Sequence, residues 1–422
     1  MSEPAQQRNA GSSSADSPPP EAREGLGTLR IAGLVVIILM VGYFLARFEI
    51  LGLESLIWGE AAATFHPTRE SALNRIVIVA ISQNEYDRDF GGQSPLNPAK
   101  LLADLINIAH AGPKLIVVDI DTSHHKYLRL SGGHAKASSR LDAEVTRWHD
   151  KFVWARPVAS QGDAYVPKAV LGEDAPPGSR LWSESGATAF PIDPNRAVTT
   201  YLRQFITGRG RLDTLPYAAA IRVPADDRIE DLPPDDRKRL LRLWGGPLTL
   251  ADRCVESSRP AGTFLACSMK DALAHPATLR NKIVIAGGVY RESNDFHETV
   301  NGKLPGIEII ADALETEASG GGPLLPSALD SLILAAIIGA LLAFAYRVVG
   351  FWTGVGINLA ASVALFLIFV YRPESSLGVL FPIPLVFLML FGFSGLHEYH
   401  ENTIRKLHRR LLRRAPERNS TT

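Results

Sequence analysis

Three clusters of acidic, imidazole and guanidinium side chains are the parts of this sequence that could do chemistry. One follows an apolar run, one lies in mid-chain, and one follows a pair of glycines. Their members are Asp119 and Asp121; Asp193, Asn195 and Arg196; and Asp295, His297 and Glu298. Carboxylates and imidazoles suit proton transfer, and arginine suits the recognition of an anionic ligand group. These are the predicted ligand-binding residues.

The first two clusters also have interpretations that need no ligand. His124 and His125 follow the first cluster, but adjacent histidines lack a standard metal-ligand spacing. A solvated loop is therefore favoured, and no metal is expected. The Asp-Pro-Asn run at 193–195 has the local chemistry of a turn. A turn does not require Arg196, whose functional interpretation is contact with an anion.

The third cluster could suggest acid–base catalysis, but no nucleophile motif accompanies Asp295, His297 and Glu298. A hydrolytic site needs both a nucleophile and a base in suitable geometry. Gly287 and Gly288 precede the cluster without the full glycine spacing of a phosphate loop, so a tight strand exit is favoured. We expect neither a cofactor nor an enzymatic activity.

The segments that must position these clusters have the pattern of an α/β domain. Residues 76–81 form a continuous apolar run, which is typical of a strand covered on both faces. Helical periodicity from Pro98 to Ala109 leads to a second run at 114–121, so a right-handed crossover between parallel strands is predicted. A strand at 282–286 and a helix at 305–318 follow. Ligands collect beyond the carboxyl ends of parallel strands, where the polar clusters would form one pocket if their loops meet.

Apolar runs on both sides of this α/β domain predict an α-helical membrane part with four transmembrane helices. Clustered Lys and Arg in the last residues indicate a cytoplasmic tail. The runs contain no Asp, Glu, Lys or His, which argues against a transporter. The predicted regions are a disordered cytoplasmic start at 1–28, a span at 29–47, an extracytoplasmic domain at 48–327, spans at 328–346, 348–371 and 377–396, and a basic tail at 397–422. A cleaved signal peptide ending near Ala61–Ala63 is the alternative to the first span.

Charge and cysteine content narrow the choice of partners. Lys plus Arg and Asp plus Glu number 44 each, so the net charge indicates no nucleic acid partner. Cys254 and Cys267 both lie in the external region, where oxidising conditions favour a disulfide; a nucleophilic cysteine is the alternative. The tail has the spacing of an amphipathic helix on anionic lipid, or of a docking helix for a cytoplasmic partner. Within 155–250 only a helix at Leu215–Ile221 is predicted.

Several segments carry a resemblance to a known family. They are the strand at Ile76, the strand ending in Asp119, the 192–196 run, and above all residues 279–287 (LRNKIVIAG) and 304–314 (LPGIEIIADAL). Over about residues 30–396 the chain resembles the CHASE2 domain, an extracytoplasmic sensory module of bacterial receptors. The family usually has an acidic residue where this chain has Ser82, and a Trp-Pro-rich loop where it has residues 91–95.

The resemblance implies a multi-pass sensory protein of the bacterial inner membrane. It would bind an unknown small-molecule or protein signal outside and relay it through its helices to a separately encoded cytoplasmic signalling protein. Receptors of this family usually continue into an output domain, for which the residues after Leu396 are too few. A homodimer and contacts with membrane lipid fit this organisation. The alternatives are a structural envelope scaffold that holds an external protein, and an external hydrolase using the third cluster.

Overall fold

The structure is a computed structural model of the 422-residue chain. It describes residues 73–122, 132–148, 150–156, 158–161, 164–167, 185–191, 197–207, 210–224, 232–244, 247–260, 262–325 and 351–371, with isolated positions between 333 and 349 and at 404. The predictions for 1–28, 29–47 and 377–396, and for nearly all of the tail, lie outside the described residues.

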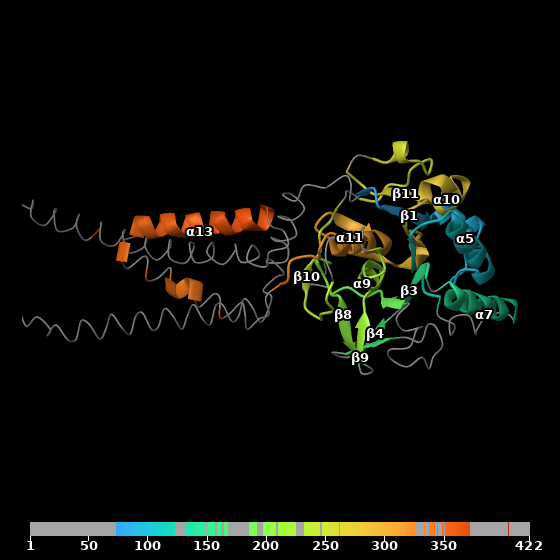
Figure 1. Ribbon diagram of the computed structural model, residues 1–422, viewed down its shortest axis with the longest axis horizontal. Helices are drawn as coiled ribbons and strands as arrows, with labels where there is room; N and C mark the ends of the chain where they lie inside the picture. The colour runs from blue at the N-terminus through green and yellow to red at the C-terminus, as the bar shows by residue number, and fades with distance from the viewer. Residues whose placement is uncertain are drawn as a thin grey trace, which may run out of the picture.

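One parallel sheet of six strands, in the order β11-β1-β12-β2-β3-β6, forms the centre of the domain (Figure 1). Its strands are β1 (Ile76–Ile81), β2 (Leu115–Asp119), β3 (Phe152–Arg156), β6 (Ser185–Ala187), β11 (Leu265–Ser268) and β12 (Ile283–Gly288). Every neighbouring pair is parallel. The predicted α/β fold with a largely parallel sheet is therefore confirmed.

Strand β12 comes late in the chain but lies between two early strands. Val284 pairs with Val77 of β1 on one side and with Ile116 of β2 on the other. All six residues of β12 are buried, as expected for a strand covered on both faces. The central part of the sheet therefore forms only when residues far apart in the sequence come together, as Ile116 and Val284 do.

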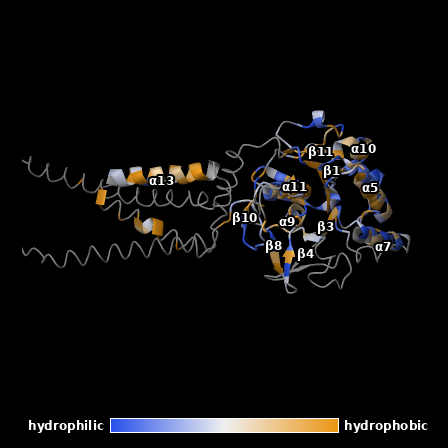
Figure 2. Ribbon diagram, viewed as in Figure 1, coloured by the Kyte–Doolittle hydropathy of each residue, from blue (hydrophilic) through white to orange (hydrophobic). Residues whose placement is uncertain are grey.

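Helices cover both faces of the sheet, because alternate strand residues point to opposite sides. Val77 and Val79 of β1 pack in the core under one group of helices, while Ile76 and Ile78 pack in the core under the other. The first group is α5 (Pro98–His110), α7 (Gly132–Arg147) and α10 (Met269–Ala274); the second is α9 (Leu215–Ala220) and α11 (Gly306–Ala318). Figure 2 shows apolar residues on the strands and on α11, and polar residues on the outer helix α7.

The region left open by the sequence, 155–250, contains short strand pairs beside α9. Pairs β4 (Val158–Gln161) with β5 (Ala164–Pro167), β8 (Gln204–Thr207) with β9 (Gly210–Asp213), and β7 (Thr200–Tyr201) with β10 (Arg239–Leu240) are antiparallel. Such short strands carry too few residues for a visible period, which is why the sequence did not predict them. The predicted helix at Leu215–Ile221 is confirmed as α9.

Ser82 is the N-cap of a short helix. It caps α4 (Gln83–Arg88) in a reciprocal arrangement: the Ser82 side chain accepts a hydrogen bond from Glu85 N, and Glu85 Oε2 accepts one from Ser82 N. The other carboxylate oxygen of Glu85 accepts from Lys270 N at 2.7 Å, which joins α4 to α10. The remaining short helices are η3 (Glu256–Ser258), η4 (Pro276–Leu279) and η5 (Arg291–Ser293).

Both ends of the α/β domain, as far as the structure describes it, lie at the amino edge of the sheet. Arg75, directly before β1, forms an ion pair with Glu315 and donates to Ser319 Oγ at 3.3 Å, both at the end of α11. The following residues, 320–325, run beside β10, where Leu240 N donates to the Pro323 carbonyl at 3.0 Å. Residues 320–325 are called the exit segment below.

Helix α13 (Phe351–Tyr371) lies within the range predicted as the third span. In the part of the chain that the structure describes, no helix meets the length and apolarity required to cross a membrane.

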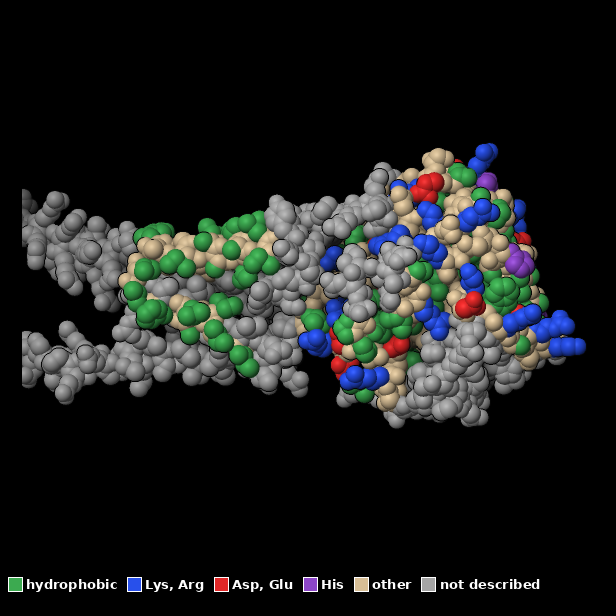
Figure 3. Space-filling model, in the orientation of Figure 1, with side chains coloured by type: hydrophobic (Ala, Val, Ile, Leu, Met, Phe, Trp, Pro, Cys, Tyr) green, Lys and Arg blue, Asp and Glu red, His purple; other side chains and the backbone are tan. Residues whose placement is uncertain are grey.

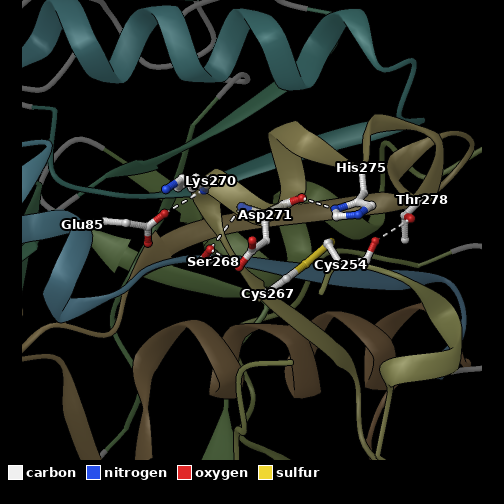
Figure 4. Close-up of a disulfide and its surroundings, with 8 residues drawn as sticks. All are labelled: Glu85, Cys254, Cys267, Ser268, Lys270, Asp271, His275 and Thr278. Carbon is white, nitrogen blue, oxygen red and sulfur yellow. Dashed lines mark hydrogen bonds between the residues drawn. A yellow bond between two sulfur atoms is a disulfide. The ribbon is translucent and has the colours of Figure 1, made fainter. Parts of the chain in front are cut away.

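Cys254 and Cys267 form a disulfide, as predicted (Figure 4). Both cysteines are fully buried, and Cys267 lies in the edge strand β11, paired with Val79 of β1. The carbonyl of Cys254 accepts a hydrogen bond from Thr278 Oγ1 at 2.7 Å. The disulfide therefore joins the segment before β11 to the edge of the sheet.

Replacing Cys254 and Cys267 together with serine should lower the free energy of unfolding by about 3 kcal/mol, since the open loop gains entropy in the unfolded chain. Urea unfolding followed by tryptophan fluorescence would measure the loss. Dithiothreitol should destabilise the wild-type chain by a similar amount and leave the double variant unchanged, because these are the only two cysteines. Equal stability of variant and wild type would contradict the prediction.

Candidate functional site

A cavity of about 250 Å³ opens beyond the carboxyl ends of β2, β3 and β12. Strand β12 lies between β1 and β2 in the sheet, so loops from early and late parts of the chain come together at this cavity. The described residues that line it are Ser94, Pro95, Leu96, Asp119, Ile120, Asp121, Ala155, Thr188, Phe190, Gly288, Tyr290, Glu292, Ser293, Asn294, Asp295, His297, Gly306 and Ile310.

The cavity brings together two of the three predicted polar clusters. Asp119 and Asp121, from the end of β2, face the same space as Asp295 and His297. His297 lies on β13 (Phe296–Thr299), which forms a hairpin with β14 (Gly302–Pro305) just before α11.

Not every predicted residue lies at this cavity. Glu298 does not line it; the Glu298 carbonyl accepts a hydrogen bond from Val198 N at 2.7 Å. Because side chains alternate along a strand, His297 and Glu298 point to opposite sides of β13. Asp193, Asn195 and Arg196, like His124 and His125, lie outside the described residues.

Asp295 is positioned by the start of α11. Its carbonyl accepts a hydrogen bond from Gly306 N at 2.8 Å, and its carboxylate lies against the Cα of the same glycine. A Cβ at position 306 would overlap the carboxylate, so any larger residue there would displace Asp295 from this position. His297 Nε2 lies 2.9 Å from Asp295 Oδ1. The carboxylate is thus fixed at the cavity wall and remains about one-third exposed, at 37% of its side-chain surface.

Asp119 contributes an unsatisfied acceptor. Its Oδ2 atom is buried and has no hydrogen-bond partner among the described residues. Burial raises the pKa of Asp119 well above its usual range, and the negative charge of Asp295 raises it further. A buried acceptor without a donor is costly, which makes this end of the cavity favourable for a ligand that can donate.

One wall of the cavity is aromatic and rigid. The Tyr290 ring stacks on Tyr86 with centroids 4.2 Å apart and an angle of 4° between the planes. A Cβ on Gly288 would come within 2.5 Å of the Tyr290 ring, so a side chain there would displace it. Burial raises the pKa of Tyr290 to about 12, which keeps the phenol neutral.

The sequence did not predict Tyr290, Glu292 or Leu96 as ligand-binding residues. Their position shortly after the glycine pair that ends β12 could have indicated Tyr290 and Glu292, because loops at the ends of parallel strands commonly bind ligands. The contact of Tyr290 with Tyr86 joins residues about 200 positions apart, and no local pattern predicts it.

The arrangement of these side chains suits binding. The Asp295–His297 pair could move a proton, but no hydroxyl among the described residues is hydrogen-bonded to the His297 ring. Ser293, the nearest serine in sequence, donates its hydroxyl to the Tyr290 carbonyl at 2.7 Å. Among the described residues no group of three His, Cys, Asp or Glu side chains is placed to hold a metal ion.

Helix α11 connects the cavity with the exit segment, and carboxylates hold it along its length. Glu308 accepts a hydrogen bond from Leu248 N at 3.0 Å, and Asp312 accepts one from Trp244 N at 2.8 Å. Burial raises the pKa of Glu308 to about 7 and that of Asp312 well above its usual range. Every residue of α11 is buried.

A buried ionic network lies at the other end of α11. Arg203 and Glu317 form an ion pair of 2.8 Å, and Tyr201 donates its hydroxyl to Glu317 at 2.5 Å. The same hydroxyl accepts a hydrogen bond from Gly322 N at 2.9 Å, while Arg239 donates to the Gly322 carbonyl at 3.0 Å. This network therefore fastens the exit segment to the end of α11.

Comparison with known proteins gives one result. The model of the CHASE2 domain family matches residues 31–346, which is most of the 422-residue chain. No curated protein and no solved structure matches the chain. CHASE2 is an extracytoplasmic sensory domain. A parallel α/β domain with a ligand-sized cavity at the carboxyl ends of its strands is compatible with that role. The chain belongs to the CHASE2 domain family.

Proposed function

We propose that this protein is a membrane-anchored sensor that binds a small extracytoplasmic ligand in the cavity and passes the binding event to its flanking membrane helices. The family supports the sensory role. The observation that carries the proposal is the course of α11, which begins at the cavity wall and ends at the exit segment.

Helix α11 is suited to carry a displacement. Its 13 residues span roughly 20 Å at a rise of about 1.5 Å per residue. Gly306 at its start touches Asp295, and Glu317 near its end holds Tyr201 and Arg203. A ligand shifts an equilibrium only if it binds one arrangement more tightly. Movement of Asp295 toward a ligand would favour one position of α11 and so one position of the exit segment.

The membrane part of the proposal rests on the predicted spans and on the surface of α13. Hydrophobic side chains cover the visible face of this helix (Figure 3). Trp352 is 72% exposed and Leu359 is 50% exposed. Contiguous apolar surface of this kind is normally covered by lipid or by another protein surface. The described ends of the α/β domain lie at the amino edge of the sheet, and the cavity lies at the opposite edge, beyond the carboxyl ends of the strands.

The proposed receiver of the signal is a separately encoded cytoplasmic protein that contacts the helix bundle or the basic tail. The protein would reside in the bacterial inner membrane with its α/β domain outside. Membrane lipid is a further proposed contact, and a homodimer is compatible with the arrangement.

Filling the cavity should alter the exit segment. With Thr188→Trp in the full-length chain in lipid nanodiscs, we expect amide hydrogen exchange at 320–325 to change by about 5-fold or more, the range of typical coupling between sites. Thr188 lines the cavity, and a tryptophan there occupies the space of a ligand. Exchange measured by mass spectrometry would test this expectation.

The matched control is Ile206→Trp, which adds the same side chain at a position that is 62% exposed and outside the cavity lining. It should leave exchange at 320–325 as in the wild type. If Thr188→Trp folds and leaves the exit segment unchanged, or if both variants change it equally, the coupling through α11 is refuted.

A further inference from the structure

The charge of the cavity lining indicates which ligands it accepts. Asp119, Asp121, Glu292 and Asp295 place four carboxyl groups around one cavity, and none of its described lining residues is Lys or Arg. Like charges gathered around a shared space repel one another, and a bound cation relieves this repulsion. An anionic ligand would instead increase the repulsion between negative charges.

A second observation points to a donor on the ligand. Asp119 Oδ2 is buried, and no described residue donates to it. Asp295, across the same cavity, is already fixed by His297 and by the start of α11. A group that carries several N–H donors could satisfy Asp119 and Asp295 together, because carboxylates accept such bonds strongly.

The remaining walls limit the body of the ligand. Phe190, Tyr290, Leu96 and Ile310 supply apolar and aromatic surface next to the carboxylates. Aromatic faces also attract ammonium groups. Small-molecule sites commonly measure roughly 300–1,000 Å³, and this cavity, at about 250 Å³, lies just below that range. The cavity therefore matches a small organic molecule rather than a peptide.

We infer that the cavity binds a small organic primary amine, whose ammonium group lies between Asp119 and Asp295 and whose apolar body packs against Tyr290 and Phe190. This inference rests on the proposed function, since it assigns a ligand class to the same cavity. The metal-ion alternative lacks a suitable ligand group among the described residues.

Isothermal titration of the full-length chain in nanodiscs, with probes of matched shape, tests the inference. The probes are 2-phenylethylamine, the neutral 2-phenylethanol and the anionic 3-phenylpropionate, with 1,4-diaminobutane as a second amine. We expect at least one amine to bind and the neutral and anionic probes to bind at least about tenfold more weakly, as befits hydrogen bonds to charged groups.

Substitutions of the cavity carboxylates test where the amine binds. Asp119→Asn and Asp295→Asn should each weaken amine binding by about tenfold or more. Glu292→Gln, at an exposed lining position, should weaken it less and serves if either aspartate variant fails to fold. The control Asp89→Asn alters an exposed aspartate outside the lining and should leave affinity unchanged.

The outcomes distinguish a wrong ligand class from a wrong proposed function. If 2-phenylethanol or 3-phenylpropionate binds as tightly as the amines and Thr188→Trp abolishes that binding, the amine inference is overturned while the cavity remains the ligand site. Amine binding that survives both aspartate substitutions also overturns the inference. If no probe binds, the amine class is rejected; if Thr188→Trp in addition leaves the exit segment unchanged, the proposed function is rejected with it.

Discussion

Glu317→Ala should destabilise the external domain by about 3–5 kcal/mol, the usual cost of removing one partner from a buried ion pair. The side chain of Arg203 is only 2% exposed, so its charge would stay buried without its partner at 2.8 Å, and among the described residues only Asp235, at 3.8 Å, would remain as an ion-pair partner. Tyr201 would lose its hydrogen-bond acceptor at the same time. Chemical unfolding of the full-length chain, followed by tryptophan fluorescence, would measure the loss of free energy.

Two comparisons make this result specific. Glu256→Ala removes a glutamate whose side chain is 47% exposed in a surface ion pair, and should cost less than about 1 kcal/mol. A double variant with Arg203→Met and Glu317→Met should be more stable than Glu317→Ala, because no buried charge is left unpaired. A Glu317→Ala chain as stable as the Glu256→Ala chain would show that the network does not hold the domain together.

The second large effect is a fall in the free energy of unfolding as the pH rises from about 5 to 8. The pKa of Glu308 is about 7 in the folded chain against an ordinary value of 4.5, because burial disfavours its charged form. Between these values the folded state holds a proton that the unfolded state has released. Rising pH therefore favours unfolding, by roughly 3 kcal/mol at about 1.4 kcal/mol per pKa unit.

The surroundings of Glu308 support this direction. Leu248 N donates to its carboxylate and lowers the pKa, but less than burial raises it. Asp312 and Glu315 on the same helix have raised pKa values through burial as well, although Arg75, directly before β1, lowers that of Glu315. The stability contributed by the protonated groups is complete below about pH 4.5 and is lost as the pH passes about 7.

Melting temperatures measured from pH 5 to 8 would test the effect. Glu308→Gln keeps an acceptor for Leu248 but carries no charge, so this variant should lose less stability over the range than the wild type. Glu298→Gln changes an exposed glutamate and should behave as the wild type. A wild-type chain that becomes more stable between pH 5 and 7 would refute the assignment.

The predicted strands and helices were those with a strong local pattern. The apolar runs of β1 and β12 and the periodicity of α5 gave their positions to within a few residues. The sequence did not predict β3, although all five of its residues are buried, because a short apolar run fits either a strand or a buried helix. The insertion of β12 between β1 and β2 depends on tertiary contacts that no local window contains.

The candidate site was predictable where it follows strand ends. Asp119 ends β2 and Asp295 follows β12, so both were predicted as ligand-binding residues at strand ends, but the sequence did not show that their loops meet. The side of β13 on which Glu298 lies depends on the register of a short hairpin, and a one-residue difference reverses it. The need for Gly306 arises only because the Asp295 carboxylate lies against it, a contact that the sequence does not display.

The hydrogen bond of 3.3 Å between Arg75 and Ser319 joins the first described residues of the α/β domain to the end of its last helix. A domain whose two ends lie close together can be inserted into another protein, because the two host residues that it connects need not move apart. The described span from Arg75 to the exit segment should therefore be transferable as a unit into a host protein through two neighbouring attachment points.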